Sequence, residues 1–197
     1  MKTRILILLL LAIGINSMAE EHLTFLGIPI DGPLDSFSRA LEQKDLPSGE
    51  RFIYHLSSMP SGTNPVFKGN FANRPAYVIA QATTETNIVY EVLVTFRELY
   101  TWNEMDSAYL ALKTYLIAQY GVPAETNEVG VGPEDVIQVK QYLDDAILIR
   151  RCRFETETGT ISLGIDNLRI HQHSRGVPYV YIIYSDKSNA ILAMQEL

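Results

Sequence analysis

Apolar residues recur at intervals of three and four positions in three segments of the chain, and this spacing predicts an amphipathic helix in each. The longest of these helices is expected to begin at Asn103 or Glu104 and to end at about Tyr120. Gly121 stands where a helix end favours a left-handed residue, and Pro123 prevents the helix from continuing. The two shorter helices are predicted from near Leu34 to just before Pro47 and from Lys187 to about Glu196.

Between the helices, short runs of β-branched, aromatic and aliphatic residues predict antiparallel strands. Polar breaks at Asn73-Arg74 and Asp144-Asp145 are typical of the turns between such strands, and Glu125 to Pro133 is expected to be a glycine-rich link. The predicted strands are Phe52 to Leu56, Val66 to Phe71, Ala76 to Thr83, Ile88 to Arg97, Val136 to Leu143, Ala146 to Glu155, Thr160 to Leu168 and Val177 to Ser185.

The order of these elements predicts an α+β fold of two tandem units, each a helix followed by an antiparallel sheet. The units are expected at residues 20–102 and 103–197, joined in one compact body with the helices packed on one face of the sheet. Lys68 to Phe71 matches Lys140 to Tyr142 at an offset of roughly 70 to 72 residues, which favours an internal duplication. The alternative is that two α+β segments simply share the same hairpin pattern.

Residues 1–19 match a secretory signal peptide, because Lys2 and Arg4 precede the apolar stretch Ile5 to Ile15, and Ser17-Met18-Ala19 is a small-residue cleavage site. A membrane anchor is the alternative, but a spanning helix needs about 20 apolar residues, nearly twice the length of this stretch. We therefore expect a periplasmic or secreted protein with no stable membrane insertion after cleavage.

Composition and charge exclude several classes of protein and of binding partner. The chain is 47% apolar and 20% charged, which is typical of globular proteins and excludes a disordered chain. Its 16 basic and 23 acidic side chains give a net charge of −7, and loss of residues 1–19, which hold two bases, leaves 14 − 23 = −9. Nucleic-acid binding is not expected of such a chain. The single cysteine, Cys152, cannot form an intrachain disulfide, lies far from any lipoprotein cleavage site, and is expected to pack in the core.

Four motifs between residues 25 and 123 stand out: Phe25-Leu26-Gly27-Ile28-Pro29-Ile30-Asp31-Gly32, the pair Phe37 and Leu41, Phe67-Lys68-Gly69-Asn70-Phe71, and Tyr109 through Tyr120-Gly121-Val122-Pro123. Together they resemble a group of uncharacterised exported proteins of Gram-negative anaerobes. The element order is also similar to that of the β-lactamase inhibitor protein and of small outer-membrane-assembly lipoproteins, whose tandem helix-plus-sheet units bind other proteins. The resemblance implies a binding module, although this chain lacks the lipobox cysteine of the lipoproteins and the disulfides of the inhibitor.

The common catalytic motifs are absent from the sequence. It contains no Gly-x-Ser-x-Gly elbow, no phosphate-binding loop and no His-Glu-x-x-His helix. Gly130-Val131-Gly132-Pro133 is not followed by a predicted helix, so it does not indicate a dinucleotide site. We therefore expect no enzymatic activity and no cofactor.

One histidine pair supports an alternative function. His171 and His173 project from the same face of an extended segment and so offer two arms of a zinc site. A third ligand is required, and the only candidates are Asp166, His55 and His22. The alternative hypothesis is therefore a metal- or small-ligand-binding envelope protein centred on His171 and His173, whereas a solvated hairpin tip explains the pair without any ligand.

Arginines and tyrosines are the main candidates for partner contacts. Alternation places Arg151 and Arg153 on one face of a strand, where guanidinium groups can bind carboxylate or phosphate. Cross-strand pairing with Glu155, Glu157 or Asp166 is the structural alternative. Tyrosines on the face that the helices leave open form good interfaces, unless they line the core instead. The predicted contact surface, for an envelope or extracellular protein as partner, consists of Tyr77, Gln81, Glu91, Arg151, Arg153, Tyr179 and Tyr181.

Overall fold

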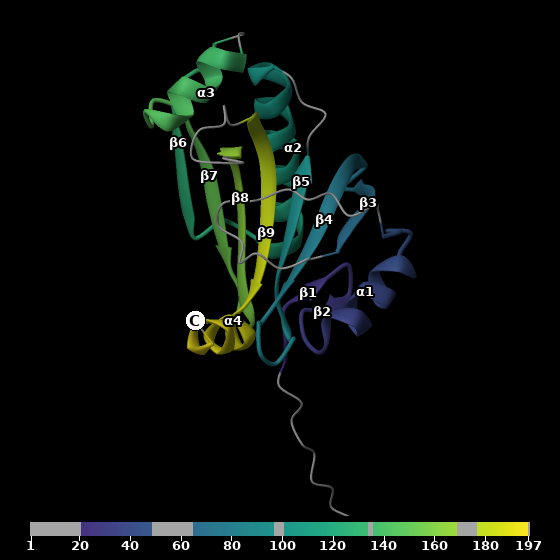
Figure 1. The fold of residues 1–197 in the computed structure, drawn as a ribbon. Helices are drawn as coiled ribbons and strands as arrows, with labels where there is room; N and C mark the ends of the chain where they lie inside the picture. The colour runs from purple at the N-terminus through teal and green to yellow at the C-terminus, as the bar shows by residue number, and fades with distance from the viewer. Residues whose placement is uncertain (1–20, 49–64, 97–100, 134–135, 169–176, 197) are drawn as a thin grey trace, which may run out of the picture.

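A computed structural model of the chain describes residues 21–48, 65–96, 101–133, 136–168 and 177–196. Within these ranges the chain forms a seven-stranded antiparallel sheet, a two-stranded hairpin and four helices, which confirms the predicted α+β class (Figure 1). The predicted signal peptide and the predicted strand Phe52 to Leu56 lie outside the described residues. The helices are α1 (Leu34–Glu42), α2 (Trp102–Tyr120), α3 (Val136–Asp144) and α4 (Lys187–Gln195).

Strands of both predicted units lie in the one large sheet, whose order is β3-β4-β5-β9-β8-β7-β6 (Figure 1). Each unit contributes a meander of antiparallel strands, and the last strands of the two meanders, β5 and β9, pair at the centre. The duplication itself stays a prediction. The strands of this sheet are β3 (Val66–Phe71), β4 (Arg74–Ala82), β5 (Val89–Phe96), β6 (Glu125–Val129), β7 (Ile149–Glu155), β8 (Gly159–Leu168) and β9 (Val177–Asp186), and β1 (Thr24–Phe25) pairs with β2 (Ile28–Pro29) in the small hairpin.

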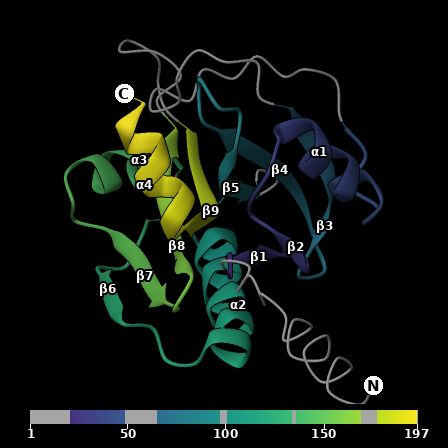
Figure 2. The same ribbon diagram turned by 90° about the horizontal axis from the view of Figure 1, so that it is seen from below.

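The main hydrophobic core lies between one face of the large sheet and the helices. Figure 2, which looks along the strands from the end near α4, shows α2 lying across this face. Helix α1 adds Phe37 and Leu41 to the same core, and α3 adds Val139. The opposite face carries a smaller cluster that consists of strand residues alone. The buried side chains of α2 are Trp102, Met105, Ala108, Tyr109, Leu112 and Leu116.

Helix α2 begins and ends at specific polar and glycine positions. The Thr101 hydroxyl accepts a hydrogen bond from the Glu104 backbone N–H (3.2 Å), and the Glu104 carboxylate accepts one from the Thr101 backbone N–H (2.9 Å). These two bonds satisfy amide groups that the first helical turn leaves without partners. Gly121 has a φ of 81° and ends the helix, as predicted. None of the helices in the described ranges is long and apolar enough to cross a bilayer.

Two predictions for the second unit are wrong. Val136 to Leu143 was expected to be a strand but lies in helix α3, because its apolar residues at 136, 139 and 143 follow the helical spacing. Glu125 to Pro133 was expected to be a link, yet its first five residues form the edge strand β6. All five of these residues are exposed, so the burial that marks most strands in a sequence is missing here.

Two finer predictions are also wrong. Lys68 to Phe71 lies in strand β3, whereas Lys140 to Tyr142 lies in helix α3, so these two segments are not structurally equivalent. The turn after β3 is formed by Ala72 and Asn73, whose φ values of 48° and 60° suit a tight hairpin, and Arg74 already belongs to β4.

A buried polar cluster joins α4 to the N-terminal segment and to β5. The Asp186 carboxylate, only 1% exposed, accepts hydrogen bonds from the backbone N–H groups of Leu23 (2.8 Å) and Asn189 (3.0 Å). The side-chain amide of Asn189 donates to the backbone oxygens of Ile30 (3.0 Å) and Val89 (3.2 Å). These bonds connect parts of the chain more than 90 residues apart, and α4 depends on them because Ile191 and Met194 on the same helix are largely exposed.

Replacement of Asn189 by alanine is expected to lower the free energy of unfolding by about 1 to 3 kcal/mol, because the buried carbonyls of Ile30 and Val89 lose their donor. Urea unfolding followed by circular dichroism measures the change. Met194→Ala is the control on the same helix, and it should change the free energy by no more than about 0.5 kcal/mol. Equal stability of the two variants would show that the cluster does not hold α4 in place.

Candidate binding face of the sheet

All seven residues of the predicted contact surface lie on the face of the sheet opposite the main core, here called the open face. The strand register aligns them in cross-strand rows. One row consists of Tyr77, Thr95, Tyr181, Gly164 and Arg151. The next consists of Ile79, Leu93, Ile183, Ser162 and Arg153. Gln81 pairs with Glu91 in a third row, and Tyr179 lies opposite Asp166. The predicted alternation is thus correct for each of these positions, whereas their part in binding stays a prediction.

Aliphatic and tyrosine side chains fill the centre of the open face. Val66, Ile79 and Leu93 form its buried middle, and the side chains that pack around them are Tyr77, Tyr179, Tyr181 and Ile183. The rings of Tyr179 and Tyr181 lie 5.7 Å apart between centroids. Tyr181 lies so close to Gly164 that a Cβ atom there would come within 2.6 Å of its hydroxyl oxygen. This close approach fixes the ring of Tyr181 against the sheet.

A hydrogen-bonded polar group lies at one end of this cluster. Gln81 Nε2 donates to Glu91 Oε1 (2.8 Å), and the Tyr90 hydroxyl donates to Gln81 Oε1 (2.9 Å). Tyr90 is the extra residue of a β-bulge, since Gln81 pairs with Glu91 while Ala82 pairs with Val89. Burial disfavours the charged form of Glu91 and raises the pKa of its carboxyl group to about 7. The open face therefore holds a carboxyl group that changes charge near neutral pH.

Ion pairs engage both arginines of the predicted surface. Arg151 Nη2 lies 3.0 Å from Asp166 Oδ2, and Arg153 Nη2 lies 2.7 Å from Glu125 Oε1 and 3.2 Å from Glu155 Oε1. The Arg151 and Arg153 side chains remain 59% and 43% exposed. Cross-strand pairing was the structural alternative for these arginines, and it is partly present. Asp166 and Glu155 form ion pairs as considered, and Glu125 forms one in place of Glu157.

Arg150, the residue before Arg151, lies on the other side of the sheet. Its Nε donates to Asp106 Oδ1 (2.6 Å), and its guanidinium group lies 5.0 Å from the centre of a Trp102 ring. Arg150 therefore fastens α2 to the sheet and takes no part in the open face.

The metal hypothesis rests largely on residues outside the described ranges, since His171, His173 and His55 all lie there. Of the other proposed ligands, Asp166 pairs with Arg151, and His22 lies 3.2 Å from Asp186 and 3.6 Å from Asp31. Across the described ranges, no group of three or more histidine, cysteine, aspartate or glutamate side chains is arranged to hold a metal ion.

Cys152 packs in the core, as predicted. It is 3% exposed, and burial raises the pKa of its thiol. Its neighbour Tyr109 is fully buried, and the Tyr109 hydroxyl donates to Glu128 Oε1 (2.8 Å). A buried thiol with a raised pKa is a poor nucleophile. Cys152 and Tyr109 both belong to the main core between α2 and the sheet.

Sequence reasoning missed Tyr90 and the apolar residues Val66 and Leu93 as parts of the open face. The bulge that brings Tyr90 toward Gln81 could not be predicted from the alternation of polar and apolar residues. Val66 and Leu93 lie in predicted strands, but the sequence analysis assigned neither residue to a face of the sheet.

No known family model, curated protein or solved structure matches this chain. The resemblance to exported proteins and to the β-lactamase inhibitor fold therefore stays a prediction, and the geometry of the chain itself supports the proposals below.

Glu91→Gln is expected to increase stability at pH 8 by about 1 to 3 kcal/mol and to leave it nearly unchanged at pH 4. Between the ordinary value of 4.5 and the raised pKa of about 7, folded Glu91 keeps a proton that the unfolded chain releases. The wild-type free energy of unfolding therefore falls as pH rises through this window. Glutamine cannot ionise and still accepts the bond from Gln81, so the variant lacks this part of the pH dependence.

Urea unfolding of both chains between pH 4 and pH 8 measures this difference, and Glu42→Gln on the exposed side of α1 is the control for loss of one carboxylate. Identical pH profiles for Glu91→Gln and wild type would show that Glu91 ionises normally in the folded chain.

Proposed function

We propose that the chain is an exported, non-catalytic protein-binding module that uses the open face of the sheet, in the periplasm or outside the cell. The observation that carries this proposal is the arrangement of the open face: a central cluster of tyrosines and aliphatic residues, bordered by exposed arginines on one side and by Gln81 and Glu91 on the other.

Tyrosine is well suited to such a surface because its ring buries a large apolar area while its hydroxyl still forms hydrogen bonds. Tyr179 and Tyr181 are held by each other and by the sheet, so little side-chain freedom is lost when a partner binds. The contact area is already ordered in the free protein, which favours specific binding.

The charges of the open face indicate the kind of partner. Arg151 and Arg153 are paired with carboxylates that are themselves partly exposed, and such surface pairs contribute only about 0 to 1 kcal/mol each. Carboxylates of a partner can therefore replace Asp166 or Glu125 in these ion pairs at little cost in free energy. We infer a protein partner with apolar side chains over the tyrosines and acidic side chains over the two arginines.

The double change Arg151→Ala and Arg153→Ala is expected to weaken partner binding at least about tenfold, since charge-assisted hydrogen bonds are worth more than 1 kcal/mol at an interface. The melting temperature should hardly change, because exposed ion pairs stabilise the fold little. In-cell cross-linking of the tagged full chain, followed by purification and quantitative mass spectrometry, measures how much partner each variant retains.

The matched control is Arg39→Ala with Lys44→Ala, which also removes two positive charges. Arg39 lies in α1, and Lys44 follows this helix. A third variant, Tyr179→Ala, tests the tyrosine cluster without a change of charge. Supporting results are loss of the same partner in both open-face variants and its retention in the control. Equal recovery from all variants, or recovery of no partner by the wild type, would contradict the proposed function.

A further inference from the structure

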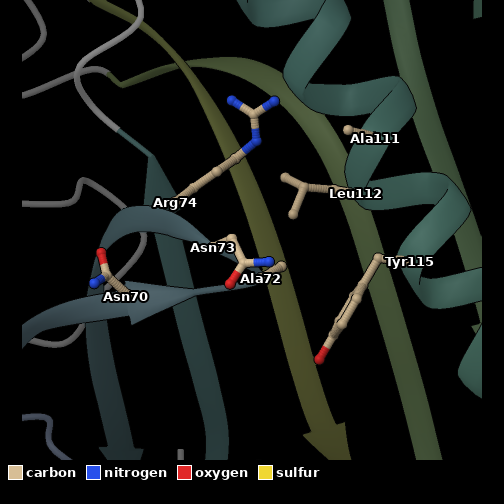
Figure 3. A pocket seen from close by; sticks show the side chains of 7 residues that line it. All are labelled: Asn70, Ala72, Asn73, Arg74, Ala111, Leu112 and Tyr115. Atoms are coloured by element: carbon tan, nitrogen blue, oxygen red, sulfur yellow. The ribbon is translucent and has the colours of Figure 1, made fainter.

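A hollow lies on the helix side of the molecule, between α2 and the tip of the β3-β4 hairpin (Figure 3). Its volume is about 380 Å³, within the range of small-molecule sites. The residues that line it are Asn70, Ala72, Asn73, Arg74, Ala111, Leu112 and Tyr115. None of the lining residues is acidic.

Arg74 gives this hollow its charge. It is the first residue of β4, and its partly buried side chain extends from the hairpin toward Ala111 on α2 (Figure 3). Of the arginine side chains in the described ranges, that of Arg74 alone forms neither an ion pair nor a hydrogen bond. The others are engaged: Arg39 with Ser36 and the Asp35 carbonyl, Arg150 with Asp106, Arg151 with Asp166 and Arg153 with Glu125. A partly buried guanidinium without a counter-charge gains most from an added anion.

The rest of the lining is mixed, with two polar asparagines beside apolar side chains of the hairpin and of α2. Leu112 is 1% exposed and forms part of the main core, and the ring of Tyr115 packs edge-on against Phe71, 5.6 Å between centroids. Figure 3 shows Leu112 and Tyr115 on the α2 side and Arg74 across from Leu112, with Asn73 below both on the hairpin. Asn73 lies in the tight turn that follows β3, and its side-chain amide offers both a donor and an acceptor.

We propose that this hollow binds a small carboxylate-bearing ligand, whose carboxylate group pairs with the Arg74 guanidinium while its apolar body lies along Ala111 and Tyr115. A planar carboxylate matches the fork of donors on a guanidinium group, and Asn73 can hold a neighbouring polar group. A short aliphatic body matches the apolar part of the lining, which Ala111 and the ring of Tyr115 offer beside the charge of Arg74.

This site is independent of the open face. Arg74 alternates with Pro75 and lies on the same side of β4 as Ala76 and Val78, which face the main core. A ligand in the hollow therefore leaves the open face uncovered, and failure of one proposal does not affect the other.

Isothermal titration of the full chain with N-acetyl-leucine and with its neutral amide tests the proposal. The two probes share the same apolar body and differ in the carboxylate. We expect millimolar or tighter binding of the acid and binding of the amide that is at least about tenfold weaker, because the charge-assisted bonds are lost. This comparison uses wild-type protein and needs no variant to fold.

Variants then locate the site. Arg74→Gln should weaken binding of N-acetyl-leucine at least about tenfold, and Arg74→Lys should give an intermediate loss because lysine keeps the charge without the fork. Arg39→Gln, which removes an equal charge on α1, should bind like the wild type. Equal affinity for acid and amide, no binding at about 10 mM of either, or equal affinity of Arg74→Gln and wild type would each overturn the proposal.

Two further probes distinguish the sources of the carboxylate. A free acid such as 4-methylpentanoate should bind as well as N-acetyl-leucine if the natural ligand is a small acid. If the ligand is the C-terminus of a peptide, N-acetyl-alanyl-leucine should bind more tightly than both. Either result supports a carboxylate site at Arg74.

Discussion

The antiparallel pairing of β5 with β9 is the interaction on which the rest of the structure depends. It joins two meanders, which α2 separates in sequence, into one sheet. Its register, with Thr95 opposite Tyr181 and Leu93 opposite Ile183, decides which side chains of the two meanders meet. A shift by one residue would exchange the two faces of β9, bury Tyr179 and Tyr181 against α2, and expose Val180 and Ile182. The large apolar surface on the helix side therefore specifies the register.

The same constraint produces two surfaces of different chemistry. The helix side is covered by α1, α2 and α3, and a hollow lies there between α2 and the β3-β4 hairpin. The other side keeps its cross-strand rows of tyrosines, aliphatic residues and paired charges. Ordered side chains on a continuous sheet suit a broad contact with a protein, whereas a hollow with one unpaired guanidinium group suits a small anion. The two proposed binding sites thus lie on opposite faces of the sheet.

Sequence patterns predicted the elements that carry strong periodicity. Helix α2 follows from the spacing of three and four positions between its buried side chains. The side of the sheet on which the seven open-face residues lie follows from the alternation of side chains along a strand. Strand β6 could not be found in this way, because an edge strand with every residue exposed has no burial pattern. Helix α3 was read as a strand because its apolar composition outweighed its spacing. The Arg74 hollow and the Tyr90 contact depend on long-range packing and on a bulge, neither of which leaves a periodic signal.

Glu91 links the proposed binding function to proton concentration. Its carboxyl group already has a pKa raised to about 7 by burial in the free chain. A protein that covers the open face removes more water from this group and raises the pKa further. Binding near neutral pH is then accompanied by uptake of a proton, and by linkage the affinity falls as pH rises above 7. Gln81 can donate to either form of the carboxyl group, so protonation changes the charge of the open face without breaking its hydrogen-bonded end. The pH sensitivity of the fold and that of the proposed interface therefore have the same physical origin, the limited hydration of one carboxyl group beside the tyrosine cluster.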